Sequence, residues 1–93
     1  MQDLYSAQIG VFMELLTNIQ EFVSGEICAK EFLAIHKSSY GLYKHLKRLC
    51  RDESLFMHKV NRRVIRYGDS ITAEESEILR ISLEKLLNRF MSN

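Results

Sequence analysis

The sequence has no proline, no tryptophan and only four glycines among its 93 residues. Proline and glycine are the residues that most often interrupt helices and form tight turns. Their scarcity argues against a fold of many short strands and favours a few long helices. No apolar run approaches the ~18 residues that a membrane-spanning helix needs, and the N-terminus lacks the basic and then apolar pattern of a signal peptide.

Cysteine is also scarce, and Cys28 and Cys50 stand far apart in the chain. Zinc sites usually contain closely spaced cysteine and histidine pairs, which the scattered His36, His45 and His58 do not supply. We therefore expect no metal, no cofactor and no disulfide, in a cytoplasmic protein with reduced thiols. No glycine-rich loop, nucleophile elbow or recognisable carboxylate pair is present, so we do not expect an enzyme.

Apolar residues repeat at three- and four-residue steps in four segments, which predicts an all-α fold. The expected helices span about 3–23, 28–50, 52–67 and 73–90, and Thr72 with Glu75 forms a capping box before the last one. Together they predict a single-domain antiparallel four-helix bundle over residues 1–93. The second helix is expected to be kinked or split near residues 38–41. The residues that the stripes place in the core are Phe12, Leu16, Phe32, Leu46, Val60, Leu79, Leu83 and Leu86.

The predicted turn between the first two helices has a distinctive sequence, Gly-Glu-Ile-Cys-Ala-Lys-Glu-Phe, over residues 25–32. This stretch resembles the helical-hairpin signature of the colicin D-like immunity proteins, where serine usually occupies the position of Cys28. These small bacterial antitoxins include partners of contact-dependent growth-inhibition toxins. The resemblance implies a cytoplasmic helical bundle that binds and neutralises one cognate toxin domain, often a tRNA-cleaving nuclease, as a heterocomplex.

The net charge of +1 conceals an uneven distribution. Residues 36–67 hold nine basic and two acidic side chains, a net charge of +7, whereas residues 1–35 have −4 and residues 68–93 have −2. Within the basic middle, two stripes follow i, i+3, i+4, i+7 spacing: Lys44, Lys47, Arg48 and Arg51, then Lys59, Arg62, Arg63 and Arg66. Each stripe predicts one basic helix face.

A basic face suits phosphates or an acidic protein surface, and Tyr40 and Tyr43 lie near enough in sequence to add stacking. The stripes therefore leave an alternative open, in which the chain is a small helical nucleic-acid-binding or regulatory protein that uses residues 44–66. Two ordinary solvated helix faces would give the same pattern.

The acidic ends supply the first candidates for a toxin-binding surface, because proteins of the resembled family usually present acidic groups in place of RNA phosphate. These candidates are Glu14, Glu21, Asp69, Glu74 and Glu77. The strongly basic middle departs from that family pattern, so the two basic stripes are the second candidates for the same partner. Solvated acids at helix starts would also explain part of the acidic set.

Overall fold

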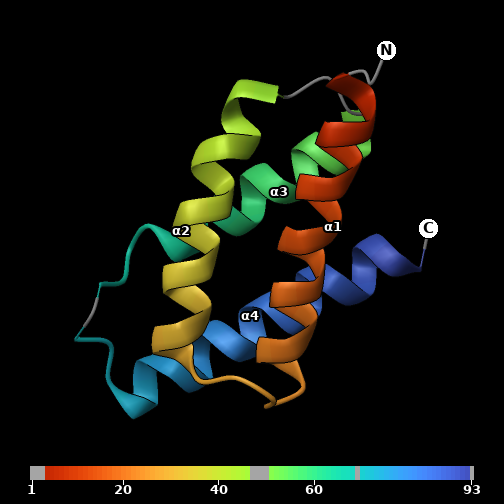
Figure 1. The fold of residues 1–93 in the computed structure, drawn as a ribbon. Helices are drawn as coiled ribbons and strands as arrows, with labels where there is room; N and C mark the ends of the chain where they lie inside the picture. Colours follow the sequence, from red (N-terminus) through yellow and green to blue (C-terminus); the bar gives the residue numbers. More distant parts are fainter. Residues whose placement is uncertain (1–3, 47–50, 69, 93) are drawn as a thin grey trace.

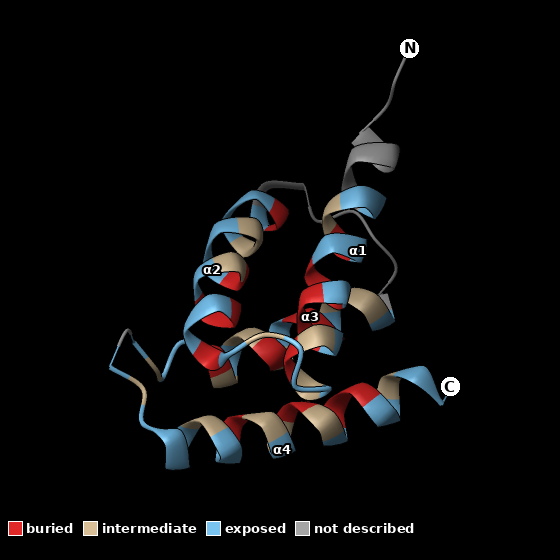
Figure 2. Ribbon diagram, turned by 60° about the horizontal axis from the view of Figure 1, so that its bottom comes forward, coloured by how far each residue is buried: buried red, intermediate tan, exposed pale blue. Residues whose placement is uncertain are grey.

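The computed structural model describes residues 4–46, 51–68 and 70–92. Its helices are α1 (Leu4–Val23), α2 (Ala29–Leu46), α3 (Arg51–Val64) and α4 (Ala73–Met91). No strand occurs in the described ranges, so the predicted all-α four-helix bundle is confirmed. Helices α1 and α2 form an antiparallel hairpin, and α3 and α4 lie behind it in Figure 1. Helix α4 crosses the hairpin and does not run alongside it (Figure 2).

The turn between α1 and α2 closes as the sequence predicts. Gly25 has a φ of +87°, which is the left-handed conformation that glycine adopts without steric cost. The N–H of Glu26 donates to the carbonyl of Glu21 at 2.8 Å, and the N–H of Gly25 donates to the carbonyl of Phe22 at 3.1 Å. These two bonds form a Schellman motif, which satisfies carbonyls at the end of α1 and fixes where the chain reverses.

Helix α2 runs without interruption through residues 38–41. The prediction named a kink or a split there, and the split is wrong. A glycine inside a helix costs about 1 kcal/mol relative to alanine, and the helix continues across Gly41 with buried side chains, His36 and Tyr43, on either side of it. The inner face of α2 presents a row of neighbouring rings: Phe32, His36, Tyr40 and Tyr43. Successive ring centroids lie 5.8, 5.5 and 5.7 Å apart, and this row spans the glycine.

Helix α4 begins with the predicted capping box. Oγ1 of Thr72 accepts a bond from the N–H of Glu75 at 3.1 Å, and Oε1 of Glu75 accepts one from the N–H of Thr72 at 3.0 Å. Helix α3 ends at Val64, earlier than the predicted end at Tyr67. The N–H of Tyr67 still donates to the carbonyl of Val64 at 3.1 Å, so the chain makes one further turn before leaving the helix.

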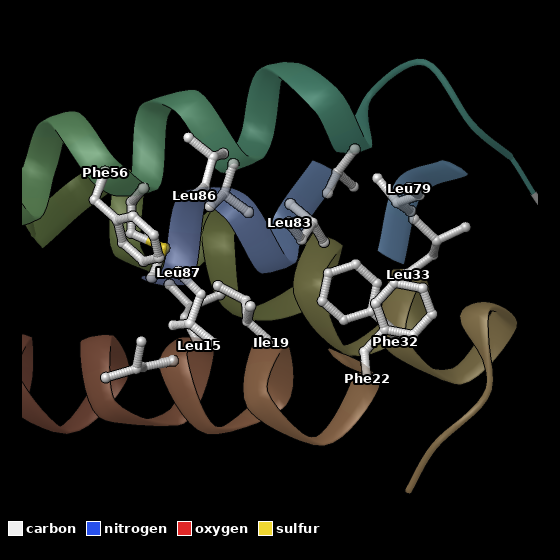
Figure 3. Close-up of a cluster of buried hydrophobic side chains, with 14 of the residues drawn as sticks. Leu15, Ile19, Phe22, Phe32, Leu33, Phe56, Leu79, Leu83, Leu86 and Leu87 are labelled. Carbon is white, nitrogen blue, oxygen red and sulfur yellow. The ribbon is translucent and has the colours of Figure 1, made fainter. Parts of the chain in front are cut away.

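The core fills the space between the α1–α2 hairpin and the α3–α4 pair (Figure 3). Every predicted core residue with a described side chain is buried; the side chain of Leu46 lies outside the described part. The rings of Phe22 and Phe32 stack with centroids 4.6 Å apart at the turn end of the hairpin. None of the described helices combines the length and apolar character needed to cross a membrane.

Candidate functional site

Helices α3 and α4 enclose an open groove of about 540 Å³, which we call the basic groove. Its basic residues come from both helices: Lys59, Arg62, Arg63, Arg66 and Arg89. The structure therefore brings the whole second stripe to one surface and adds Arg89, which sequence reasoning missed. Only the antiparallel pairing of α3 with α4 places Arg89 beside that stripe, and the spacing of charges along the chain does not reveal this pairing.

One of these cations is anchored in the wall of the groove. Nε of Arg63 donates to Oγ of Ser82 on α4 at 2.8 Å, and Nη1 donates to the carbonyl of Lys59 at 3.0 Å. These bonds link α3 to α4, so Arg63 has a structural role as well as an electrostatic one. Arg62 and Arg66, by contrast, are exposed and remain open to a partner.

Within the described part of the chain, no carboxylate forms an ion pair with a cation of the basic groove, because the ion pairs there join Arg80 to Glu77 and Glu84. Within α3, Lys59 forms like-charge pairs with Arg62 and Arg63 at i,i+3 and i,i+4, whereas Arg66 lies beyond the helix end at Val64. At roughly 0.2–0.5 kcal/mol each, these two pairs destabilise the helix by about 0.4–1 kcal/mol. The position of Arg62 and Arg63 in the last turn of α3 offsets part of this cost. An anionic partner would remove the rest.

Apolar side chains lie between the charges. Leu79 and Leu86 are buried beneath the groove, whereas Ile78 lines it with 57% of its surface exposed. The groove continues into a second hollow of about 350 Å³, which shares Lys59, Leu86 and Arg89. This hollow adds the half-exposed Leu55 and the carboxylates of Asp52 and Glu53. Arginine is enriched at protein–protein contacts, and the buried centre of such contacts is more apolar than the rest of the surface.

The first basic stripe is described only in part. Lys44 is exposed on α2, whereas Lys47, Arg48 and the side chain of Arg51 lie outside the described residues. The tyrosines expected to accompany this stripe point elsewhere. Tyr43 is buried in the core, and the half-buried ring of Tyr40 stacks on His36. The prediction that the tyrosines add stacking or interface contacts is therefore wrong for Tyr43, whereas for the partly exposed Tyr40 it stays a prediction.

His36 is fully buried and links α2 to α3. Its Nε2 lies 3.2 Å from Oδ1 of Asn61, an arrangement in which the ring N–H donates to the amide oxygen. Burial lowers the pKa of His36, the hydrogen bond to Asn61 opposes this change, and the charge of Lys37 reinforces it. A neutral ring therefore serves the fold here. No group of three or more potential metal-binding histidine, cysteine, aspartate or glutamate side chains occurs among the described residues.

The acidic candidates are divided between two places. Glu14 and Glu21 line a groove between α1 and α2. Glu74 and Glu77 are exposed in the first turns of α4, and Asp69 lies outside the described residues. The structure therefore does not gather the acidic candidates into one groove, whereas it places the whole second basic stripe in the basic groove.

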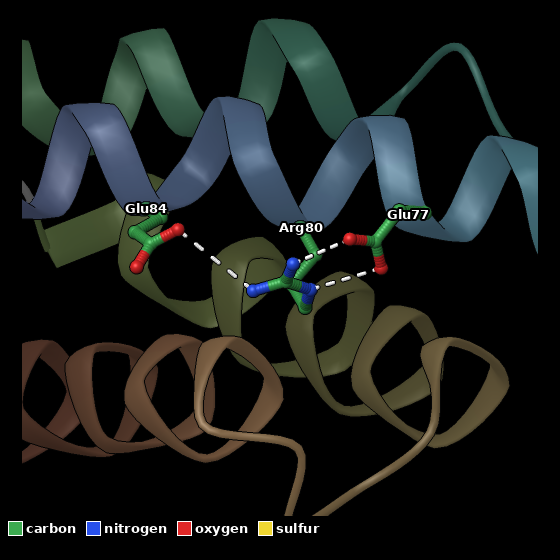
Figure 4. Close-up of polar contacts among 3 residues, drawn as sticks. All are labelled: Glu77, Arg80 and Glu84. Carbon is green, nitrogen blue, oxygen red and sulfur yellow. Dashed lines mark hydrogen bonds and ion pairs between the residues drawn. The ribbon is translucent and has the colours of Figure 1, made fainter.

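Part of the acidic set is also paired within the chain. Nε of Arg80 donates to Oε1 of Glu77 at 3.0 Å, and Nη1 of Arg80 lies 3.8 Å from Oε1 of Glu84 (Figure 4). The hydrogen bond from Arg80 lowers the pKa of Glu77, so this carboxylate is charged and already has a cation. Glu77 is a weaker candidate for a partner contact than its position in the sequence indicates.

No protein-family model, no curated protein and no solved structure matches this chain. Two features indicate the function: the geometry of the basic groove and the resemblance of residues 25–32 to the immunity-protein hairpin.

Proposed function

We propose that this chain is an immunity protein, which binds and neutralises a toxin domain encoded beside it and performs no catalysis of its own. In this proposal the complex forms in the cytoplasm. The basic groove between α3 and α4 is the contact surface. The hairpin sequence over residues 25–32 supports the class of partner, and the groove supports the place of contact.

The observation that supports this proposal most is the set of basic side chains around exposed aliphatic groups, without an acidic partner in the described part of the chain. Arg62 and Arg66 are exposed and offer donors that fit carboxylates in a fixed geometry. Ile78 supplies apolar area that a partner would cover. The expected counterpart is an acidic surface of the toxin with apolar residues at its centre.

The same groove bears on how the toxin would be inhibited. A nuclease needs basic groups to hold phosphate, and a basic groove is repelled by such a surface. If the toxin is an RNase, we therefore expect contact outside its phosphate-binding surface, through an acidic region. This mode differs from mimicry of RNA by acidic residues, which the resemblance alone implies.

A nucleic-acid-binding function remains the alternative, because five cations in one groove would also attract phosphates. Two observations favour a protein partner. Single-stranded nucleic acid is usually held by exposed aromatic rings, and here Tyr43 is buried while Tyr40 stacks on His36. The net charge of only +1 also leaves acidic ends that would repel a polyanion.

The test uses cells that express the toxin domain encoded beside this chain. The variant Arg62→Glu/Arg66→Glu reverses two exposed charges and leaves the anchored Arg63 in place. The control Lys30→Glu/Lys85→Glu makes the same change in net charge at exposed positions that do not line the groove. We expect wild type and the control to protect the cells and the groove variant to lose protection.

Two results would contradict the proposal. Failure of the wild-type chain to protect against the neighbouring toxin would exclude the immunity function. Equal protection by both variants would exclude the groove as the contact. In parallel, fluorescence anisotropy with a labelled RNA oligonucleotide tests the alternative, because phosphate binding must weaken steeply with salt. A submicromolar, salt-sensitive complex would favour the nucleic-acid-binding function.

A further inference from the structure

A second groove, of opposite chemistry, lies between α1 and α2. It has a volume of about 740 Å³, and we call it the acceptor groove. Its polar walls include Glu14, Asn18 and Glu21 of α1 and Ser39 of α2. No lysine, arginine or histidine is among its lining residues in the described part of the chain.

Asn18 is the most informative residue of this groove, because it is 97% buried and only half satisfied. Its Nδ2 donates to the carbonyl of Phe32 at 3.1 Å, and this bond fixes which end of the amide is the oxygen. The opposite atom, Oδ1, has no hydrogen-bond partner among the described residues. A buried acceptor without a donor destabilises the folded chain, so a donor supplied from outside would stabilise the site.

The charges around Asn18 specify what kind of donor fits. Glu14 and Glu21 stand four residues before and three residues after it, and therefore share its helix face. The hydroxyl of Ser39 donates to Oε1 of Glu14 at 3.1 Å and holds this carboxylate over the groove. A site with two carboxylates and an amide oxygen accepts hydrogen bonds and favours positive charge.

Apolar groups in the same groove fit the stem of a long cationic side chain. Met13 is 51% exposed and lines the groove together with Ile35 of α2. Lysine and arginine bury their methylene stems on apolar surface while the charged head contacts polar groups. Oδ1 of Asn18 has almost no accessible surface in this structure, so a ligand reaches it after a side-chain rotamer change, which is common at contact surfaces on binding.

We propose that the acceptor groove binds an arginine or lysine side chain of a basic segment in a protein partner. The cation contacts Glu14 and Glu21, its N–H groups reach Oδ1 of Asn18, and its stem packs on Met13. This surface is distinct from the basic groove and opposite to it in charge. It does not depend on the toxin contact proposed above.

The test is a titration of the isolated protein, followed by NMR, with a capped hexapeptide that contains one arginine between leucines. A matched peptide contains citrulline, which keeps N–H donors but has no charge. We expect saturable shifts of the Asn18 side-chain amide and of the backbone amides of Ser38 and Ser39. The citrulline peptide should bind at least fivefold more weakly.

Variants complete the test. Glu14→Gln/Glu21→Gln keeps the shape of the groove and removes its charge, so we expect the arginine peptide to bind at least fivefold more weakly. The control Glu31→Gln/Glu74→Gln removes two exposed carboxylates outside the groove and should bind like wild type. Equal affinity for both peptides, equal affinity of both variants, or an unshifted Asn18 amide at saturation would each overturn the proposal. Because no toxin is present, none of these outcomes bears on the immunity function.

Discussion

The buried His36 makes the stability of the fold depend on pH in a direction that can be stated in advance. Burial holds the pKa of His36 in the folded chain below its ordinary value of 6.5, whereas the unfolded chain has the ordinary value. As pH falls through 6.5, the unfolded chain therefore binds a proton that the folded chain excludes. The free energy of unfolding therefore decreases as the pH falls below 6.5. Above this pH, the neutral His36 contributes its full stabilisation.

The difference in the pKa of His36 between the folded and unfolded chains also sets how much stability is lost. One pKa unit corresponds to ~1.4 kcal/mol, so the slope is at most ~1.4 kcal/mol per pH unit below 6.5. Between about pH 6.5 and pH 5 the loss reaches at most ~2 kcal/mol. A chain of this length has a total stability of ~5–14 kcal/mol, so such a loss is readily measured. Protonation of the folded chain is unfavourable because Nδ1 of His36 is buried and has no hydrogen-bond partner among the described residues.

Urea denaturation of wild type and of His36→Phe, at several pH values from about 7.5 to 5, tests this reasoning. Phenylalanine keeps a ring beside Phe32 and Tyr40 but cannot be protonated. Asn61 is only partly buried, so its amide can turn to water. We expect a shallower loss of stability in the variant below pH 6.5. Since all other titrating groups are shared, equal slopes in the two chains would refute the assigned role of His36.

Chemical denaturation also tests three features of the fold. Leu83→Ala should cost about 2–5 kcal/mol because the side chain is 1% exposed, whereas Ile81→Ala, at a position 40% exposed, should cost clearly less; equal costs would mean that the buried face of α4 is wrong. Thr72→Ala should cost about 1 kcal/mol through loss of the N-cap, and no change would show that the capping box contributes nothing. Gly25→Ala should destabilise by about 1 kcal/mol because its φ is positive. Gly41→Ala should stabilise by about 0.5–1 kcal/mol, since an added Cβ meets nothing within 4 Å. The opposite order for the two glycines would contradict the backbone description.

The helix ends were predictable from sequence because their chemistry is local. The left-handed Gly25 and the reciprocal bonds of Thr72 and Glu75 each involve residues a few positions apart. The apolar stripes were predictable for the same reason, since a helix places residues three and four apart on one face. The four-helix architecture followed from these local signals.

What the sequence did not reveal depends on packing between helices. The polar residues around Gly41 predicted a break in α2, but the helix is continuous and buries His36 and Tyr43, on either side of the glycine, in the fold. The position of Tyr43 next to the first basic stripe predicted a surface tyrosine, but its side chain is buried in the core. Arg89 joins the basic groove only because α4 returns along α3. Each of these is a tertiary effect without a local signature.

The central claim is that the basic groove contacts the toxin domain, and methyl cross-saturation NMR of the complex tests it most directly. Saturation of the toxin attenuates only those methyl signals of this chain that touch it. We predict attenuation at Ile78 and Leu55, which are exposed beside the groove cations, and little change at Met13 in the acceptor groove. Attenuation at Met13 with Ile78 and Leu55 unchanged would contradict the account.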